Sequence, residues 1–144
     1  MQVHQILRSK LVGDIITVLP GTSVADAARL MAERRIGAVI VSPDGKTPVG
    51  ILSERDIVRD LGRRGSGCLA DKVDSLMTRN LVVCTPTDKA DDVLEKMTVG
   101  RFRHMPVMQD GVMTGLISIG DVVAARLAEL AMEKNALEGM IMGN

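Results

Sequence analysis

The sequence predicts a mixed α/β (α+β) fold made of two similar halves, each with the element order β-α-β-β-α. A signature occurs twice: residues 50–56, GILSERD, return sixty-five residues later as residues 115–121, GLISIGD. The strand and helix patterns around the two copies also agree, which indicates an internal repeat. One such unit cannot cover both faces of its sheet, so we expect two pseudo-symmetric repeats packed sheet to sheet as one module.

Each repeat is expected to open with a short strand, at residues 14–18 and 80–84. A helix follows in each, because apolar residues recur at i, i+3, i+4 and i+7 from Val24 and from Ala90. The candidate N-caps are Thr22 or Ser23 for the first helix and Asp88 for the second.

Two more strands in each repeat surround an Asp-Gly pair, at residues 44–45 and 110–111, which predicts a β hairpin. Their first strands are residues 38–41 and 104–108. The second strand of each hairpin carries the signature and ends at its Ser, where a helical pattern begins.

A short apolar helix or turn is expected before each repeat, because two triplets share one spacing. They are Val3, Ile6 and Leu7, and Val73, Leu76 and Met77. Residues 62–67 are Gly-rich and are expected to be a mobile, solvated linker. The expected boundaries are 8–66 for the first repeat, 73–130 for the second and 131–144 for a C-terminal helix or tail.

The C-terminal segment has a heptad-like apolar stripe. It comprises Val123, Leu127, Leu130, Leu137 and Ile141, with Lys134 at the missing position. Two interpretations are open: a terminal helix lying on its own domain, or a helix packing on a partner.

Composition excludes several functions. The chain has 144 residues, 46% hydrophobic, with Phe102 as its single aromatic, so an aliphatic, Met-rich core is expected. Equal numbers of basic and acidic residues, 18 each, and no Trp or Tyr argue against nucleic-acid and acidic-membrane binding. No apolar run is long enough for a membrane span and no signal peptide is seen, so we expect a cytoplasmic protein. Cys68 and Cys84 lack CxxC spacing, so buried or free thiols are expected, with no metal site.

The signature has two possible roles. Ser followed three residues later by Asp is a capping-box pattern, in which the two side chains bond reciprocally to backbone N–H groups. A strand-to-helix junction is also an anion site, because unpaired N–H groups and the helix dipole favour negative charge. Repetition of the same Gly, Ser and Asp favours a function beyond capping.

These residues resemble a tandem pair of cystathionine-β-synthase (CBS) domains of the stand-alone, two-repeat bacterial type, over residues 8–130. The most specific marks are the duplicated Gly-x-x-Ser-x-x-Asp and the segment RHMPV at 103–107, which is similar to the family's basic pair before a Pro-Val strand. The resemblance implies a regulatory sensor that binds an adenine nucleotide (AMP, ADP, ATP or NAD(H)) in clefts between the repeats.

The resemblance also implies residue roles. Asp56 and Asp121 would accept hydrogen bonds from ribose hydroxyls. Ser53 and Ser118 would meet phosphate oxygens. Arg55, Arg103 and His104 would neutralise phosphate charge, His104 in a pH-dependent way. The adenine would lie among Ile16, Thr17, Val83, Ile51 and Leu116.

The repeats differ at positions that matter for charge. Repeat one has Gly37-Ala38 where repeat two has Arg103-His104, and repeat two has Gly120 where repeat one has Arg55. We therefore expect unequal clefts, with phosphorylated ligands bound tightest where Arg103 and His104 reach. The other arginines are interpreted as solvated charges at helix ends and in the linker: Arg34, Arg35, Arg101, Arg63 and Arg64.

A homodimer is expected, because a flat two-repeat module leaves apolar helix faces exposed. The contrasting hypothesis is a ligand-free structural or oligomerisation module that binds a partner protein. No Ser-His-acid or Cys-His set, metal-ligand cluster or phosphate loop is present, so no catalytic residues and no enzymatic activity are predicted. The intact Ser and Asp pairs favour the sensor.

Overall fold

A computed structural model describes residues 1–9 and 15–142 of the chain. The helices are α1 (Val3–Ser9), α2 (Val24–Arg34), α3 (Glu54–Arg64), the 3-10 helix η1 (Gly65–Ala70), α4 (Val73–Leu76), α5 (Ala90–Gly100) and α6 (Ile119–Ile141). The strands are β1 (Thr17–Val18), β2 (Ala38–Val41), β3 (Gly50–Ser53), β4 (His104–Gln109) and β5 (Val112–Ser118). The α/β fold is confirmed, and the predicted order β-α-β-β-α is found in repeat one, whereas repeat two lacks the first strand.

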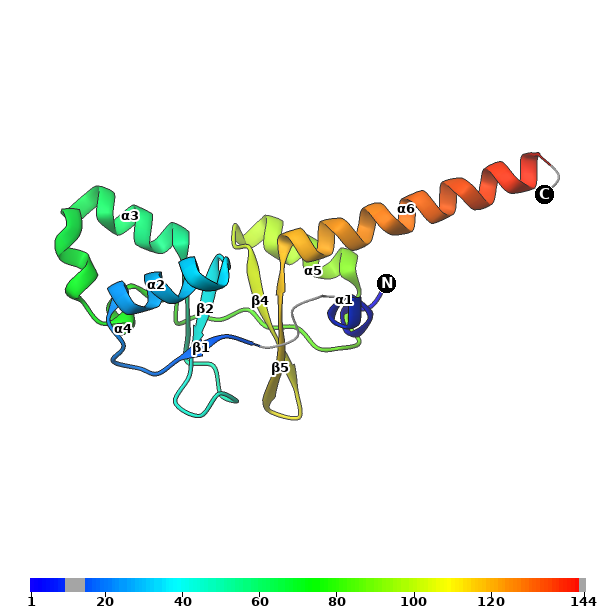
Figure 1. Cartoon of the computed structure of the whole chain (residues 1–144). Helices are drawn as coiled ribbons and strands as arrows, with labels where there is room; N and C mark the ends of the chain where they lie inside the picture. Colours follow the sequence, from blue (N-terminus) through cyan, green and yellow to red (C-terminus); the bar gives the residue numbers. More distant parts are fainter. Residues whose placement is uncertain (10–14, 143–144) are drawn as a thin grey trace.

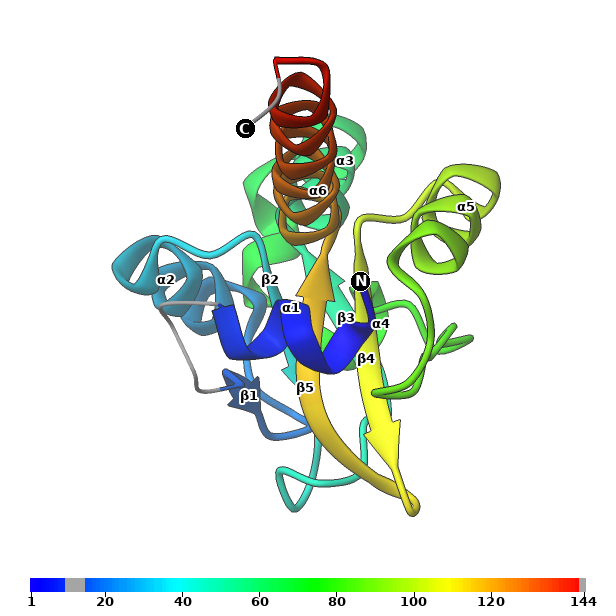
Figure 2. The ribbon, with the colours of Figure 1, turned by 90° about the vertical axis from the view of Figure 1, so that its right-hand side faces the viewer.

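The strands form two small sheets that lie next to each other at the centre of the module (Figures 1 and 2). In one sheet β1 pairs parallel with β2, and β2 pairs antiparallel with β3. The other sheet is the β4–β5 hairpin, whose turn holds Asp110 and Gly111 at positive φ, as the Asp-Gly pattern predicts. In Figure 1 the helices α2, α3, α5 and α6 lie in the upper half of the module, and the loops of both hairpins point down, away from them.

The strand expected at residues 80–84 is wrong except for its last residue. Cys84 forms an isolated parallel bridge with Val107, through Cys84 N–H to Pro106 O (3.0 Å) and Met108 N–H to Cys84 O (2.8 Å). In repeat one the corresponding ladder continues, because Ile40 N–H donates to Ile16 O (3.2 Å). Pro106 stands sixty-six residues after Ile40 and has no N–H, so this bond has no counterpart and the strand ends. Of the strand expected at 14–18, Asp14 lies outside the described residues.

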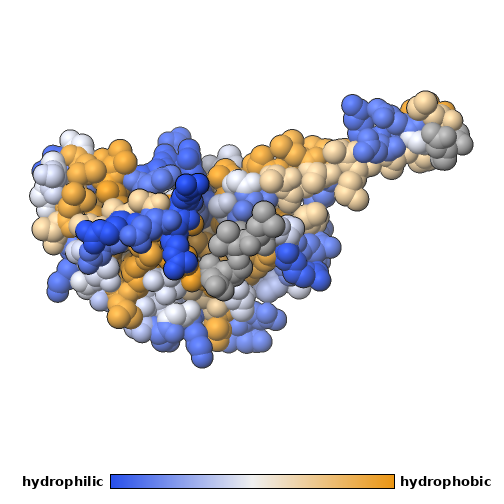
Figure 3. Space-filling view, in the orientation of Figure 1, coloured by the Kyte–Doolittle hydropathy of each residue, from blue (hydrophilic) through white to orange (hydrophobic). Residues whose placement is uncertain are grey.

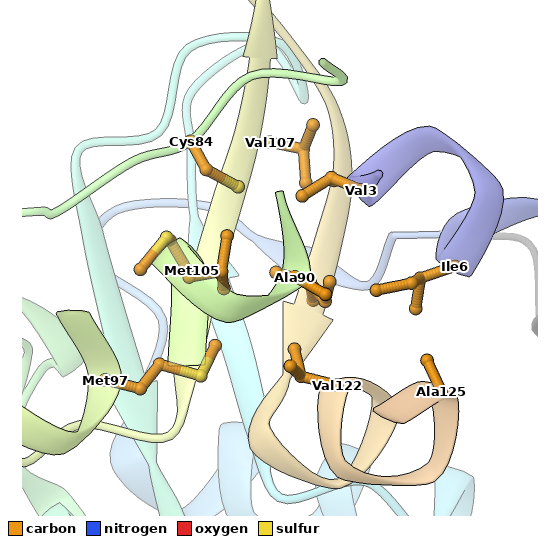
Figure 4. Packing of buried hydrophobic residues seen from close by; sticks show 11 residues of the cluster. Val3, Ile6, Cys84, Ala90, Met97, Met105, Val107, Val122 and Ala125 are labelled. Carbon is orange, nitrogen blue, oxygen red and sulfur yellow. The ribbon is translucent and has the colours of Figure 1, made fainter. Parts of the chain in front are cut away.

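The core is divided into two aliphatic clusters, one in each repeat, and each contains two buried methionines: Met31 and Met77 in repeat one, and Met97 and Met105 in repeat two. Figure 4 shows the cluster of repeat two, which contains Met97, Met105 and Cys84 as well as Val122 from α6. Cys68 and Cys84 are both free and buried, as expected. Burial raises the pKa of the Cys84 thiol to about 12, because the thiolate loses its hydration.

The short lead-in helices are exchanged between the repeats. Helix α1 precedes repeat one, yet its Val3 and Ile6 are part of the repeat-two core (Figure 4). Helix α4 precedes repeat two, yet its Val73 packs in the repeat-one core. The hydrogen bonds agree: Val3 N–H donates to Asp88 O (2.9 Å), and Val73 N–H donates to Thr22 O (2.8 Å). Each repeat therefore needs the other's lead-in to complete its core.

The N-cap of the first long helix of each repeat, α2 or α5, is as predicted in repeat one only. Ser23 caps α2, since its side chain accepts from the Asp26 N–H at 3.1 Å. The N-cap expected at Asp88 is wrong. Helix α5 begins at Ala90, and the Asp88 carboxylate accepts instead from the Thr85 N–H at 2.9 Å.

The Gly-rich segment 62–67 is solvated but is not a linker. It forms the end of α3 and the start of η1, which continues to the buried Cys68. The Arg64 guanidinium contacts the carboxylates of both Asp60 and Asp71, and these hydrogen bonds raise its pKa further above its ordinary value. Arg64 thus joins α3 to the segment that enters α4.

Helix α6 is longer than any other and leaves the body of the protein (Figure 1). Only Val122 and Ala125 of its residues are buried, and both lie in its first two turns. A terminal helix lying on its own domain is therefore excluded, and the expected boundary at 130 falls inside this continuous helix. Within the described residues, no helix is both long and apolar enough to cross a membrane.

Candidate functional site

Both copies of the signature place a Ser and an Asp at the start of a helix in the same geometry. In repeat one, Ser53 is the N-cap of α3: the Asp56 N–H donates to Ser53 Oγ (3.3 Å), and the Ser53 N–H donates to Asp56 Oδ2 (2.9 Å). The Asp56 side chain is only 11% exposed, and its second oxygen contacts the guanidinium of Arg59. Repeat one therefore has a full capping box.

Repeat two reproduces this arrangement at the start of α6. The Asp121 N–H donates to Ser118 Oγ (3.1 Å), and the Ser118 N–H donates to Asp121 Oδ2 (2.9 Å). The capping interpretation of the signature is thus confirmed in both repeats. The capping box explains why each signature has a Ser and an Asp. It does not explain the shared Gly or the cavities beside the two signatures.

The signature glycines are needed for close packing of the exchanged lead-ins. A Cβ on Gly50 would lie 2.4 Å from Met77 Sδ, and one on Gly115 would lie 2.8 Å from Leu7 Cδ1. Leu7 and Met77 are equivalent residues of the two lead-in triplets. A side chain at either glycine would force the side chain of Met77 or Leu7 to move from its place on the strand.

A cavity of about 550 Å³ opens at the signature of repeat one, and we call it the first cleft. Its walls come from both repeats, because the start of α3 faces the segment before and at the start of β4. It is lined by Gly37, Ile51, Ser53, Glu54, Arg55, Asp56, Arg59, Thr78, Asn80, Leu81, Val82, Gly100, Arg101, Phe102, Arg103 and His104.

A cavity of about 370 Å³ opens at the signature of repeat two, and we call it the second cleft. Here the start of α6 faces the segment before and at the start of β2, so the second cleft is the pseudo-symmetric partner of the first. It is lined by Leu7, Ile15, Ile16, Arg35, Ile36, Gly37, Ala38, His104, Thr114, Gly115, Leu116, Ser118 and Asp121. Gly37 and His104 line both clefts and so lie between them.

The clefts differ strongly in charge. The first cleft has four arginines, Arg55, Arg59, Arg101 and Arg103, against the two acids Glu54 and Asp56. The second has Arg35 against Asp121. The first cleft is thus suited to an anion with several charges, and the second to a ligand with little or no net charge.

Most residues expected in the site line one of the clefts. The first cleft holds Ile51, Ser53, Arg55, Asp56 and Arg103; the second holds Ile16, Leu116, Ser118 and Asp121; His104 belongs to both. The open question of which Asp shares a cleft with Arg103 is decided by the structure: it is Asp56, from the other repeat.

Thr17 and Val83 line neither cleft. The residues just before them line the clefts instead: Ile15 and Ile16 the second cleft, and Leu81 and Val82 the first. Ile16 and Val82 are equivalent in the two repeats, sixty-six residues apart.

Several polar residues of the clefts were not predicted from the sequence. Arg35 and Arg101, interpreted as solvated helix-end charges, are left-handed C-cap residues (φ 53° and 56°) that also line the second and first cleft. The two arginines hold equivalent positions in the repeats, each three residues before the first residue of a strand of the cleft wall, and this equivalence could have identified them from the sequence. Arg59 could have been found from the helical spacing, since it follows Arg55 by one turn on the same face.

Comparison with known proteins agrees with this architecture. The CBS domain family matches residues 4–63 and 73–128, one match for each repeat. This chain belongs to the CBS domain family. Its two repeats form a CBS pair, which is a regulatory module.

Related CBS proteins cover the chain to different extents. The crystal structure of the CBS-domain containing protein ATU1752 from Agrobacterium tumefaciens is 40% identical, with a TM-score of 0.83, over 88% of this chain and 99% of that protein. The mitochondrial CBS domain-containing protein CBSX3 of Arabidopsis thaliana is 36% identical over 84% of this chain. The chain spans 61% of CBSX3, and 23% and 24% of two longer CBS proteins from the same plant.

One structural relative is described with ligands. The CBS domain pair of protein MJ0100, in complex with 5'-methylthioadenosine and S-adenosyl-L-methionine, has a TM-score of 0.77 over 90% of this chain and 98% of that chain. It is 23% identical in sequence, so it shares the CBS fold with this chain.

Proposed function

We propose that this CBS pair is a regulatory sensor, without catalytic activity of its own, that binds adenine nucleotides in its two clefts. The observation that carries the proposal is that each cleft joins the signature of one repeat to the strand entry of the other. A ligand there contacts both repeats at once, so its binding is coupled to how the repeats pack. The adenosine-type ligands of the MJ0100 pair support the ligand class.

The ribose would be held by Asp56 in the first cleft and by Asp121 in the second. A carboxylate oxygen accepts more than one hydrogen bond, so each Asp can keep its capping bond and accept from a ribose hydroxyl. In the first cleft Asp56 also contacts Arg59. We expect a nucleotide to draw Arg59 toward its phosphates while the ribose hydroxyls take its place on Asp56.

The phosphates would lie at the first cleft, where Arg55 and Arg103 converge from different repeats. Arg supplies a planar fork of donors that matches phosphate oxygens, and the start of α3 adds backbone N–H groups beside Ser53. The second cleft has one Arg and would take a ligand with fewer phosphates or none. AMP, ADP, ATP and NAD(H) are the candidates for the first cleft.

The adenine would pack on aliphatic side chains near the signature strands. Ile51 offers this surface in the first cleft, and Ile16 with Leu116 in the second. Phe102, the single aromatic of the chain, lines the first cleft and also packs against the core of repeat two.

The remaining parts of the proposal concern assembly and place. We propose a homodimer in the cytoplasm, with repeats at 8–66 and 73–130 as the ligand-binding module and residues 131–144 outside it. The homodimer is supported by exposed apolar side chains on both signature helices, such as Val58 of α3 (66% exposed) and Leu127 of α6 (62% exposed).

Calorimetric titration of AMP, ADP, ATP, NADH and adenosine tests the sensor. We expect binding in the micromolar to millimolar range, with Asp56→Asn and Asp121→Asn each weakening one of two sites about tenfold. The amide oxygen of Asn can still accept from the N–H of the capping Ser, so these variants keep the capping box and remove the charge. The competing function is a ligand-free assembly module. In that case the signature Ser and Asp would serve only to cap their helices. No heat with any of these ligands at millimolar concentration would support that function and reject the sensor.

A further inference from the structure

The distal part of α6 is a helix without a covering surface. Residues 130–138 are all exposed, and the helix runs away from the body (Figure 1). At 23 residues and a rise of about 1.5 Å each, α6 is about 35 Å long. Figure 3 shows hydrophobic surface that continues from the body onto the protruding helix and is interrupted by a hydrophilic band near its end.

Five exposed apolar residues of α6 lie on one face at coiled-coil spacing, whereas the exposed Met132 and Met140 lie off this face. Val123, Leu127, Leu130, Leu137 and Ile141 are between 41% and 84% exposed, and they follow steps of four and three residues with Lys134 at the vacant core position. We call these six residues the α6 stripe. Such a seam is stable in water only when another helix covers it.

We propose that the α6 stripe pairs with the α6 stripe of a second copy of this chain, and that the two helices run antiparallel. This inference rests on the homodimer proposed above, and it adds which surface forms the interface and in which direction the two helices run. The stripe is self-complementary when one copy is reversed. Val123 then lies against Ile141 of the partner subunit, Leu127 against Leu137 of the partner subunit, and Leu130 against Lys134 of the partner subunit.

Lys134 decides the orientation. In a parallel pair equal core positions face each other, so two Lys134 ammonium groups would meet in the seam, and Glu133 would face Glu138 of the partner subunit. In the antiparallel pair each Lys134 stem packs on a leucine, and its ammonium can extend to Glu133 of the partner subunit. Within one chain Lys134 meets Glu138 at 3.9 Å, and both side chains are more than half exposed, so this weak pair is easily exchanged.

The surface of the pair is tested with charge substitutions in the stripe. Leu137→Glu should raise the dimer dissociation constant about 100-fold or more, because each dimer loses two buried leucines. Val99→Glu is the matched control, since Val99 is 79% exposed on α5 and lies outside the stripe. Light scattering and sedimentation give the mass, and AMP titration with circular dichroism shows that the body is intact.

The orientation is tested with single cysteines and a short bismaleimide. Ala131 lies beside the centre of the antiparallel seam, so Ala131→Cys should cross-link to itself. Ile141→Cys should not, because the two copies would lie about 27 Å apart along the axis; in a parallel pair they would be in contact. The native Cys68 and Cys84 are buried and stay out of the reaction.

The outcomes separate this inference from the proposed function. A dimer that persists in Leu137→Glu places the interface elsewhere, and cross-linking through Ile141→Cys alone means a parallel pair; either result overturns the inference and leaves the homodimer standing. A monomeric wild-type chain overturns both. Nucleotide binding is measured on the same samples and does not depend on any of these results, because every residue of both clefts comes from one chain.

Discussion

Replacing Arg103 by Ala tests how the first cleft would distinguish phosphorylated ligands from unphosphorylated ones. Arg103 lines this cleft opposite the signature of repeat one, where Gly37 is its pseudo-symmetric counterpart in the second cleft. Glycine has no side-chain donor, so the variant makes the two clefts more alike. The expected result is a selective loss: AMP should bind more weakly, and adenosine should bind as before.

The magnitude follows from the kind of contact that is lost. A charge-assisted hydrogen bond contributes about 1.5–3 kcal/mol, which corresponds to a roughly 10- to 100-fold loss of affinity for AMP. Arg103 is exposed at the mouth of the cleft, so salt screens part of this and the loss should be nearest its upper value at low ionic strength. ATP should lose at least as much as AMP, since more phosphate oxygens face the arginines.

The assay is a pair of calorimetric titrations, AMP and adenosine, for wild type, Arg103→Ala and Arg29→Ala. Arg29 is exposed on α2 in an ion pair with Asp26, so Arg29→Ala makes the same change of net charge away from the clefts. An equal loss for AMP and adenosine would mean that Arg103 supports the fold. Equal losses in Arg103→Ala and Arg29→Ala would mean that only the net charge matters, and either outcome refutes the reasoning.

Three further predictions concern packing, pH and thiol chemistry. Gly115→Ala should destabilise the protein by about 1–3 kcal/mol, because its Cβ would lie 2.8 Å from Leu7 Cδ1, and Leu7→Ala should restore part of the lost melting temperature; no rescue would contradict this packing account. Asp44 accepts from the Lys46 and Thr47 N–H groups, which lowers its pKa to about 2. Its folded pKa is depressed, so its contribution is present above about pH 4 and fades as the pH falls toward 2. Asp44→Asn should therefore lower the thermal stability at pH 7 but not at pH 2, and a difference that is constant with pH would count against it. Cys84, with its pKa raised to about 12, should resist iodoacetamide at pH 8 until denaturant is added, and rapid labelling of the native protein, measured by mass spectrometry, would show that it is accessible.

The sequence by itself determined the repeat, the order of its elements and the residues at both helix starts. These features depend on short-range chemistry. Ser53 and Asp56 are three residues apart, so a capping box and the strand-to-helix junction can be predicted from local spacing alone. The loss of the strand before Cys84 also has a local cause, the missing N–H of Pro106, although it becomes visible only once Pro106 is aligned with Ile40.

The composition of the clefts and the course of α6 were decided only by the tertiary structure. Arg103 shares a cleft with Asp56 because the repeats face each other, and Leu7 covers Gly115 because the lead-ins are exchanged. Apolar periodicity predicts that one face of a helix is buried, but it does not identify the surface that buries it. The α6 stripe has the same pattern whether the helix folds back or extends, since burial of apolar area is non-directional and any complementary surface satisfies it.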